Sequence, residues 1–182
     1  MGAAILLSPS SRAHADEPTL PAPLQAGLLA KVAAYDRNLR GIRLGKVIVA
    51  IVTRRGDLDS TSVGARLRAG LEGIPAIAGM PHEEIMVTWT NAAAVAEICE
   101  TSNVSIAYVA PGLEREMPAI AAVLQGMEVL TAGAMPDYVG KGAVLGFDLV
   151  SGRPRILVHL GEARRQRVDL TAQLLKLAVI VE

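Results

Sequence analysis

Three apolar segments of the chain are each followed by small or polar residues at positions where a ligand could be held. The segments are residues 46–53, 85–89 and 104–109. If they are parallel strands, the residues after them lie beyond the carboxyl ends of the sheet, where open α/β folds bind ligands and helix N-termini present free amides. Short strand-to-helix loops need the same residue types for structural reasons. The candidate ligand-binding residues are Gly56, Asp57, Asp59, Asn91, Pro111 and Gly112.

No set of residues typical of an enzyme is visible. His82-Glu83-Glu84 lacks the second histidine that a zinc-protease helix requires four residues after the first. His159 follows an apolar run, and we expect its side chain to bond the start of the next helix. No serine lies in a G-x-S-x-G sequence, and no G-x-G-x-x-G occurs. We therefore predict no catalytic residue, no metal site and no cofactor. An enzyme with an unrecognised site is the remaining alternative.

Two segments favour contact with another protein. Five arginines fall between residues 153 and 167, where they could bind an anionic surface or simply form a solvated face. The segment 135–139 lies between two predicted strands, and we expect an apolar, exposed loop tip there. The predicted partner-binding residues are Met135, Tyr138, Arg153, Arg155, Arg164, Arg165 and Arg167.

Composition limits the class of partner and the kind of core. The chain has 182 residues, with 18 basic residues balancing 18 acidic ones, so it lacks the basic excess typical of nucleic-acid-binding proteins. Apolar residues make up 51% and aromatic residues only 3%, which predicts a large aliphatic core. The single cysteine, Cys99, cannot form an intramolecular disulfide, and its helical spacing from Val95 predicts that it is buried.

The N-terminal residues indicate export. Ala13-His14-Ala15 matches the small-x-small pattern that precedes a signal-peptidase cleavage site, and a polar segment follows. The short apolar run 1–7 lacks a basic flank, so we interpret residues 1–15 as the remnant of a signal peptide that begins upstream and is cleaved after Ala15. No other stretch approaches the ~18 apolar residues of a membrane span. We expect a periplasmic protein whose residues 16–182 form one domain.

Helical and strand patterns alternate along this domain. Apolar periodicity predicts helices over 24–39, over 60–72 with Asp59 or Ser60 as the cap, around 95–99, and over 117–124. Strands are predicted at 46–53, 85–89, 104–109 and 127–131, and a hairpin turns at Ser151-Gly152. Two more helices follow, the second reaching Val181. The alternation predicts an α/β three-layer sandwich, with a mainly parallel sheet, helices on both faces and a C-terminal antiparallel hairpin at one edge.

Several short segments of residues 101–181 follow one another in a characteristic order. Val129–Thr131 is a strand, Met135–Tyr138 a loop, and Gly142–Gly146 a glycine-rich strand start. Glu162-Ala163-Arg164-Arg165 then begins a helix, and Leu174–Ala178 belongs to the last one. In order and spacing these segments resemble the YfiR-like family of periplasmic proteins. The chain departs from that family's pattern at the end of its first helix, which lacks an aromatic stretch closing on Trp-Pro, and in lacking paired cysteines.

The resemblance implies a function by contact. Named members of the YfiR-like family restrain a membrane-bound diguanylate cyclase, so a similar protein is expected to be non-enzymatic, homodimeric and bound to another protein. We predict a periplasmic regulator that binds the extracytoplasmic part of a membrane signalling protein, such as a diguanylate cyclase or a sensor kinase. The alternative is a small-ligand-binding module that resembles half of a solute-binding protein and uses the loops after the first three strands.

Overall fold

The computed structural model describes residues 20–39 and 45–182. The predicted signal-peptide remnant, residues 1–15, and its cleavage position after Ala15 lie outside these ranges.

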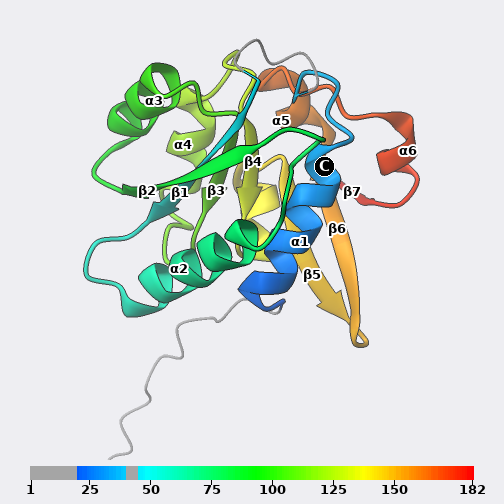
Figure 1. Cartoon of the computed structure of the whole chain (residues 1–182), viewed down its shortest axis with the longest axis horizontal. Coiled ribbons are helices and arrows are strands. Elements are labelled where there is room, and N and C mark those ends of the chain that lie inside the picture. The colour runs from blue at the N-terminus through cyan, green and yellow to red at the C-terminus, as the bar shows by residue number, and fades with distance from the viewer. Residues whose placement is uncertain (1–19, 40–44) are drawn as a thin grey trace, which may run out of the picture.

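In the described chain, seven strands form one sheet with the order β2-β1-β3-β4-β5-β6-β7 (Figure 1). The first five strands run parallel, β6 is antiparallel to β5, and β7 is parallel to β6. The strands are β1 (Val47–Thr53), β2 (His82–Thr88), β3 (Ile106–Val109), β4 (Leu130–Gly133), β5 (Leu145–Val150), β6 (Arg153–His159) and β7 (Val179–Val181). Every residue of β1, β3 and β4 is buried, which explains why their sequences are continuous rather than alternating apolar runs.

Helices cover both faces of this sheet. On one face, α1 (Ala22–Ala33) and α2 (Leu58–Glu72) pack together, and α5 (Leu160–Arg165) and α6 (Ala172–Leu175) add residues to the same apolar cluster. The other face carries α3 (Ala92–Thr101), α4 (Met117–Val123) and the 3₁₀ helix η2 (Pro136–Lys141). Val49 and Ile51 of β1 belong to the first cluster, whereas Ile48 and Val52 belong to the second. The predicted three-layer α/β sandwich is therefore confirmed.

Two predicted helices are shorter than expected. The last one ends at Leu175, and Val179–Val181 is the edge strand β7, paired with β6. Three consecutive β-branched residues favour this strand, and the predicted hairpin thus lies one strand inside the edge. The first helix ends at Ala33 because the chain then pairs Asp36 with Leu170 in an isolated bridge.

That bridge fastens the end of α1 to the C-terminal segment. The buried Asp36 carboxylate accepts hydrogen bonds through Oδ1 from the backbone N–H of Asn38, at 3.0 Å, and of Asp169, at 3.2 Å. The backbone N–H of Arg37 donates to Asp169 O at 2.9 Å, and that of Thr171 donates to Tyr35 O at 3.0 Å. Burial raises the pKa of Asp36, since the charged carboxylate loses water, although the two backbone bonds oppose the shift.

The segment containing Met135 and Tyr138 is not the exposed loop tip that we expected. η2 lies against β4 and β5 where the paired glycines Gly133 and Gly146 leave no side chain on the sheet. Tyr138 fills this gap and is 1% exposed, while Met135 is half-buried and packs on both apolar clusters. Glycine within a strand often marks such a close approach. The expectation of exposure is therefore wrong for Tyr138.

Candidate functional site

The predicted ligand-binding residues surround the point where the strand order reverses. From β1 the chain crosses to β2 on one side and then to β3 on the other, so the loops after β1 and β3 diverge there. Asp57 and Gly112 come from these two loops, and a Cβ added to Gly112 would lie 2.5 Å from Asp57 Oδ2. The structure thus brings these two residues together. Gly112 is suited to this contact because it has no side chain and its φ is +80°.

Arg54 occupies the space between the two loops. Its Nε donates a hydrogen bond to Gly112 O, and its Nη2 donates to Glu116 Oε1 at 2.5 Å. The other Glu116 carboxylate oxygen, Oε2, is buried and has no hydrogen-bond partner in the described chain. The guanidinium is therefore committed to a carbonyl and a carboxylate. In this arrangement it links the loop after β1 to the loop after β3.

The remaining candidates at this end of the sheet have separate structural roles. Asp57 Oδ1 accepts from the backbone N–H of Ser60 at 3.0 Å and caps α2, so the predicted caps Asp59 and Ser60 were two or three residues too late. Asn91 Oδ1 accepts from Ala94 N at 2.9 Å and caps α3. Asp59 is exposed in the first turn of α2. Gly56 has φ +75° and no other atom near its Cβ position, and Pro111 is buried.

Tyr138 supports the loop after β3 from below. Its hydroxyl accepts from Leu113 N at 2.9 Å and donates to Ala110 O at 3.3 Å. Burial raises the pKa of this phenol well above its ordinary range, so it stays neutral. The candidate residues taken from the sequence did not include Arg54 or Glu116, and Tyr138 was given a different role. The available signal was weak: Arg54 directly follows a strand and Glu116 directly precedes a helix.

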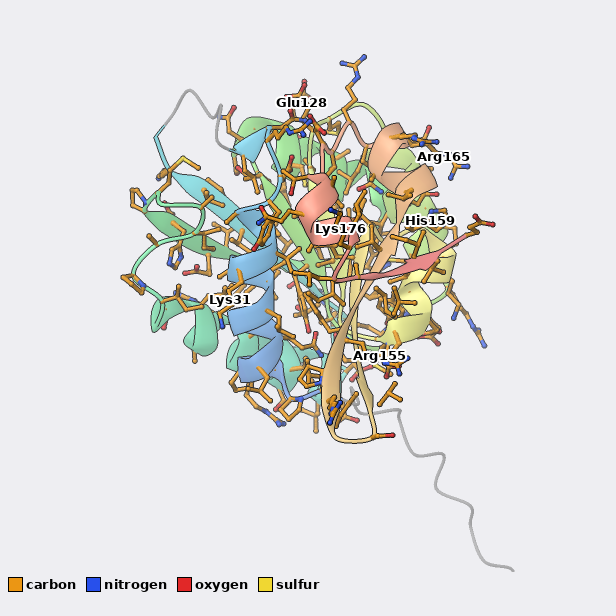
Figure 2. All side chains as sticks on the ribbon, turned by 90° about the vertical axis from the view of Figure 1, so that its right-hand side faces the viewer. Lys31, Glu128, Arg155, His159, Arg165 and Lys176 are labelled. Carbon is orange, nitrogen blue, oxygen red and sulfur yellow. The ribbon has the colours of Figure 1, made fainter. Side chains whose placement is uncertain are left out.

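The five arginines predicted to bind a partner do not form one patch. Arg153 and Arg155 begin β6 next to the hairpin turn, whereas Arg164, Arg165 and Arg167 lie on or just after α5, past the other end of β6. β6 is seven residues long, so its two ends lie roughly 20 Å apart. Figure 2 shows this separation, with Arg155 at the lower end of the hairpin and Arg165 near the opposite end.

Other candidate centres give no sign of chemistry. Cys99 is buried, as predicted, and burial raises the pKa of its thiol to about 11. His159 Nδ1 accepts from Glu162 N at 3.2 Å and caps α5, also as predicted.

Within residues 20–39 and 45–182 no group of three or more His, Cys, Asp and Glu side chains could hold a metal ion. No helix of the same ranges has the length and apolar character needed to cross a membrane.

Solved structures with the same fold are distant in sequence. The chain matches a conserved domain protein from Vibrio cholerae with a TM-score of 0.62 and 11% identity, over 89% of this chain and 60% of that one. It matches the ABC domain in complex with L-Trp from Streptococcus pneumonia with a TM-score of 0.59 and 15% identity, over 89% and 62%. A ligand-free, open substrate-binding protein with adhesive properties from Clostridium difficile gives 0.58 and 12%, over 86% and 58%. The chain thus spans about three fifths of each neighbour's length.

Sequence comparisons identify the family. No curated protein matches the chain. The family model described as YfiR/HmsC-like matches residues 61–179, which contain the sheet from β2 to the start of β7, as well as most of α2. The chain belongs to the YfiR/HmsC-like family.

Proposed function

We propose that this chain is a non-enzymatic periplasmic regulator that binds the extracytoplasmic part of a membrane signalling protein. Its membership of the YfiR/HmsC-like family carries the proposal, because YfiR-like proteins are periplasmic and regulatory. The arrangement of side chains agrees with a role by contact. At the strand ends, where an α/β enzyme would hold its substrate, the Arg54 and Glu116 side chains pair with each other.

The hairpin of β5 and β6 supplies the surface that we assign to the partner. Arg153 and Arg155 are exposed and two residues apart on one strand, so they lie on the same face. Val150 of the neighbouring strand pairs with Arg153, so it lies on that face, and it is half-buried. Arginines beside a partly exposed apolar side chain suit an acidic partner surface, since arginine is enriched in protein interfaces. Tyr138 is buried and is not part of this surface.

The test is capture of a membrane protein by a tagged form of residues 16–182. Detergent-solubilised membranes of the source cell would be applied to it, and the bound proteins identified by mass spectrometry. We expect one membrane protein with a periplasmic sensing domain, and at least a tenfold loss of it with the Arg153→Glu/Arg155→Glu variant. The charge-matched Arg66→Glu/Arg115→Glu variant, at exposed positions on and near other helices, should retain it. Equal capture by both variants would exclude the hairpin, and no capture would exclude the regulator.

The proposal includes a homodimer. The edge strand β7 has no neighbour on its outer side in the described chain, and Val179 and Ile180 are 42% and 39% exposed. Exposed apolar edges of this kind favour pairing with a second strand. Light scattering on the purified protein should give twice the mass of one chain, and Ile180→Lys should reduce it to one. A monomeric wild-type protein would contradict this part of the proposal.

A small-ligand-binding module is the second candidate. It is supported by the shared fold with a substrate-binding protein and with a domain that is in complex with L-Trp. A ligand at the strand ends would require Arg54 to leave Gly112 and Glu116. A thermal-shift screen separates the candidates, because a ligand at 100-fold its Kd adds about 2.7 kcal/mol to the free energy of unfolding.

A further inference from the structure

The segment between α2 and β2, residues 74–81, is attached to the sheet by a buried histidine side chain. Ile77 is fully buried in the apolar cluster under α1 and α2, and its backbone exchanges two hydrogen bonds of 2.9 Å with Met80. His82 is the first residue of the edge strand β2, and its Nε2 lies 2.7 Å from Ile74 O. One side chain of the edge strand therefore holds the start of this segment in place.

Both ring nitrogens of His82 face atoms that accept hydrogen bonds. Besides the contact of Nε2 with Ile74 O, Nδ1 lies 2.5 Å from Glu84 Oε1. A carbonyl and an ionised carboxylate only accept hydrogen bonds, whereas a neutral imidazole has one N–H to donate. Two donated bonds require protons on both nitrogens. The geometry therefore fits an imidazolium paired with the Glu84 carboxylate.

The surroundings favour this charged form of the ring. The His82 and Glu84 side chains are each 6% exposed, so water weakens their attraction little. Ile74 directly follows Gly73, the cap of α2, and a positive charge is favourable close to the C-terminus of a helix. Without the imidazolium, the Glu84 carboxylate would lose this donor in a buried position, which is costly.

Other charged groups of the surrounding elements are exposed or bonded elsewhere. β1 and the segment 74–81 contain no titratable residue. On β2, Glu83 points to the opposite face of the sheet and accepts from Lys46 Nζ at 2.6 Å. On α2, the exposed Arg68 and Glu72 pair with each other at 2.8 Å. The remaining charged residues of α1 and α2 are all exposed: Lys31, Asp59 and Arg66.

We propose that His82 and Glu84 form a proton-dependent latch that holds the segment 74–81 on the sheet. When the imidazolium loses the proton on Nδ1, a nitrogen lone pair faces the carboxylate oxygen and the bond between them is lost. The latch is therefore closed while the ring is protonated, and it opens as the pH rises through the titration of His82. Opening uncovers Ile77 beside β2, at the edge of the sheet that lies away from the hairpin. The protein would thus respond to pH independently of the hairpin surface.

The titration of the ring tests the ion pair. Residues 16–182 contain two histidines, and nitrogen-15 magnetic resonance follows the protonation of each ring as the pH changes. We expect Glu84→Gln to lower the proton affinity of the His82 ring at least about tenfold, because the carboxylate that favours the imidazolium is removed. His159, whose Nδ1 accepts from Glu162 N, is the internal reference and should titrate as in the wild type. An unchanged titration of His82 would overturn the proposal.

Hydrogen exchange of backbone amides tests the latch itself. In the wild type, the protection of the Ile77 and Met80 N–H groups, corrected for the intrinsic effect of pH on exchange, should fall at least about tenfold as His82 loses its proton. The N–H of Ala110, which donates to Val52 O at 2.9 Å, should keep its protection because the rest of the sheet stays folded. Constant protection of Ile77 and Met80, or an equal loss at Ala110, would contradict the latch.

A matched pair of variants identifies the responsible carboxylate. Glu84→Gln can turn its amide to accept from Nδ1–H or to donate to a bare Nδ1, so the protection of Ile77 should no longer change with pH. Glu83→Gln is the same substitution at the next residue, on the opposite face, and should keep the wild-type response. Circular dichroism melts confirm that both variants are folded, and the wild-type exchange data decide the question if Glu84→Gln is unstable. The same pH response in both folded variants would overturn the proposal.

Discussion

At the scale of single residues, the position of Gly112 disfavours any side chain for two reasons. Its backbone has φ +80°, and its Cα faces the Asp57 carboxylate that caps α2. Gly56 in the facing loop has nearly the same φ, +75°, but open space around it. Comparing substitutions at the two glycines therefore distinguishes the energetic cost of the backbone conformation from the cost of the close contact.

We expect Gly112→Ala to destabilise the protein more than Gly56→Ala. Both variants pay about 1–2 kcal/mol for a left-handed backbone. Gly112→Ala should lose a further ~1–3 kcal/mol, because the new methyl group displaces the Asp57 cap. Urea denaturation measures both values. Equal losses would mean that the Asp57 side chain moves aside freely.

Asp36 is the residue whose ionisation should affect stability. Its pKa in the folded protein is raised, mainly by burial, so the folded state holds its proton more tightly than the unfolded state does. The stabilisation is complete below the ordinary aspartate pKa and is lost as the pH rises through the raised native value. Asp36→Asn cannot titrate and keeps an oxygen for the N–H groups of Asn38 and Asp169.

We therefore expect the stability of the wild type, relative to Asp36→Asn, to fall as the pH rises above the ordinary aspartate pKa of about 4 and through the raised native pKa. Denaturant unfolding at several pH values measures the difference. Asp36→Ala serves as the control, and it should be about 2–4 kcal/mol less stable than Asp36→Asn at every pH, because neither variant titrates and two buried N–H groups lose their acceptor. A constant difference between wild type and Asp36→Asn would show that Asp36 does not titrate in this range.

At the scale of elements, the packing of η2 on the sheet depends on two paired glycines. A Cβ at Gly133 would be 2.5 Å from Tyr138 Cβ, and one at Gly146 would be 2.4 Å from Val139 Cγ2. Because Tyr138 Cβ is held close to the backbone of η2, it cannot turn away as the end of a long side chain would. Gly133 of β4 and Gly146 of β5 thus leave the space that positions the Tyr138 phenol under the loop after β3.

We expect Gly133→Ala to cost about 1–3 kcal/mol through overpacking against Tyr138. Gly140→Ala is the matched control in η2 itself, since Gly140 is exposed and has no atom near its Cβ position. Thermal melts followed by circular dichroism compare the two variants. If Gly133→Ala melted at the same temperature as the wild type, η2 would be able to move away from the new methyl group without loss of stability.

Local patterns were sufficient for most of the elements but not for all of them. The continuous run of β1 and the apolar stripe of Val63, Leu67 and Leu71 on α2 indicate their burial directly. The ends of α1 and α6 were wrong because pairing of Asp36 with Leu170, and of β7 with β6, depends on residues far apart in the chain. At the strand ends, position alone predicted that Asp57 and Gly112 would lie near the sheet's switch point. The closing contact of Arg54 depends on side-chain reach, which no spacing reveals.

At the scale of the whole molecule, two apolar clusters share one sheet. Alternate residues of β1 belong to opposite clusters. Because both clusters depend on this strand, unfolding of one would remove packing residues from the other. This supports the expectation that residues 16–182 are one domain, which remains a prediction.

We therefore expect unfolding in one cooperative transition. The only tryptophan of the chain, Trp89, packs against the cluster of α3 and α4, while far-ultraviolet circular dichroism reports on the helices of both faces. The two signals should give the same midpoint in urea. Separate midpoints would divide the molecule into independently stable parts.

The bond between Asp36 and the segment 169–171 also sets an order of events during synthesis. The acceptor on Asp36 is synthesised early, whereas its donor, the N–H of Asp169, follows 133 residues later. A chain that emerges from its N-terminus cannot make this contact until the 133 residues from Asp36 to Asp169 are all available. For a chain that is exported as we propose, this contact would form only after Asp169 has crossed the membrane, so the preceding segment would stay unfolded enough to pass through.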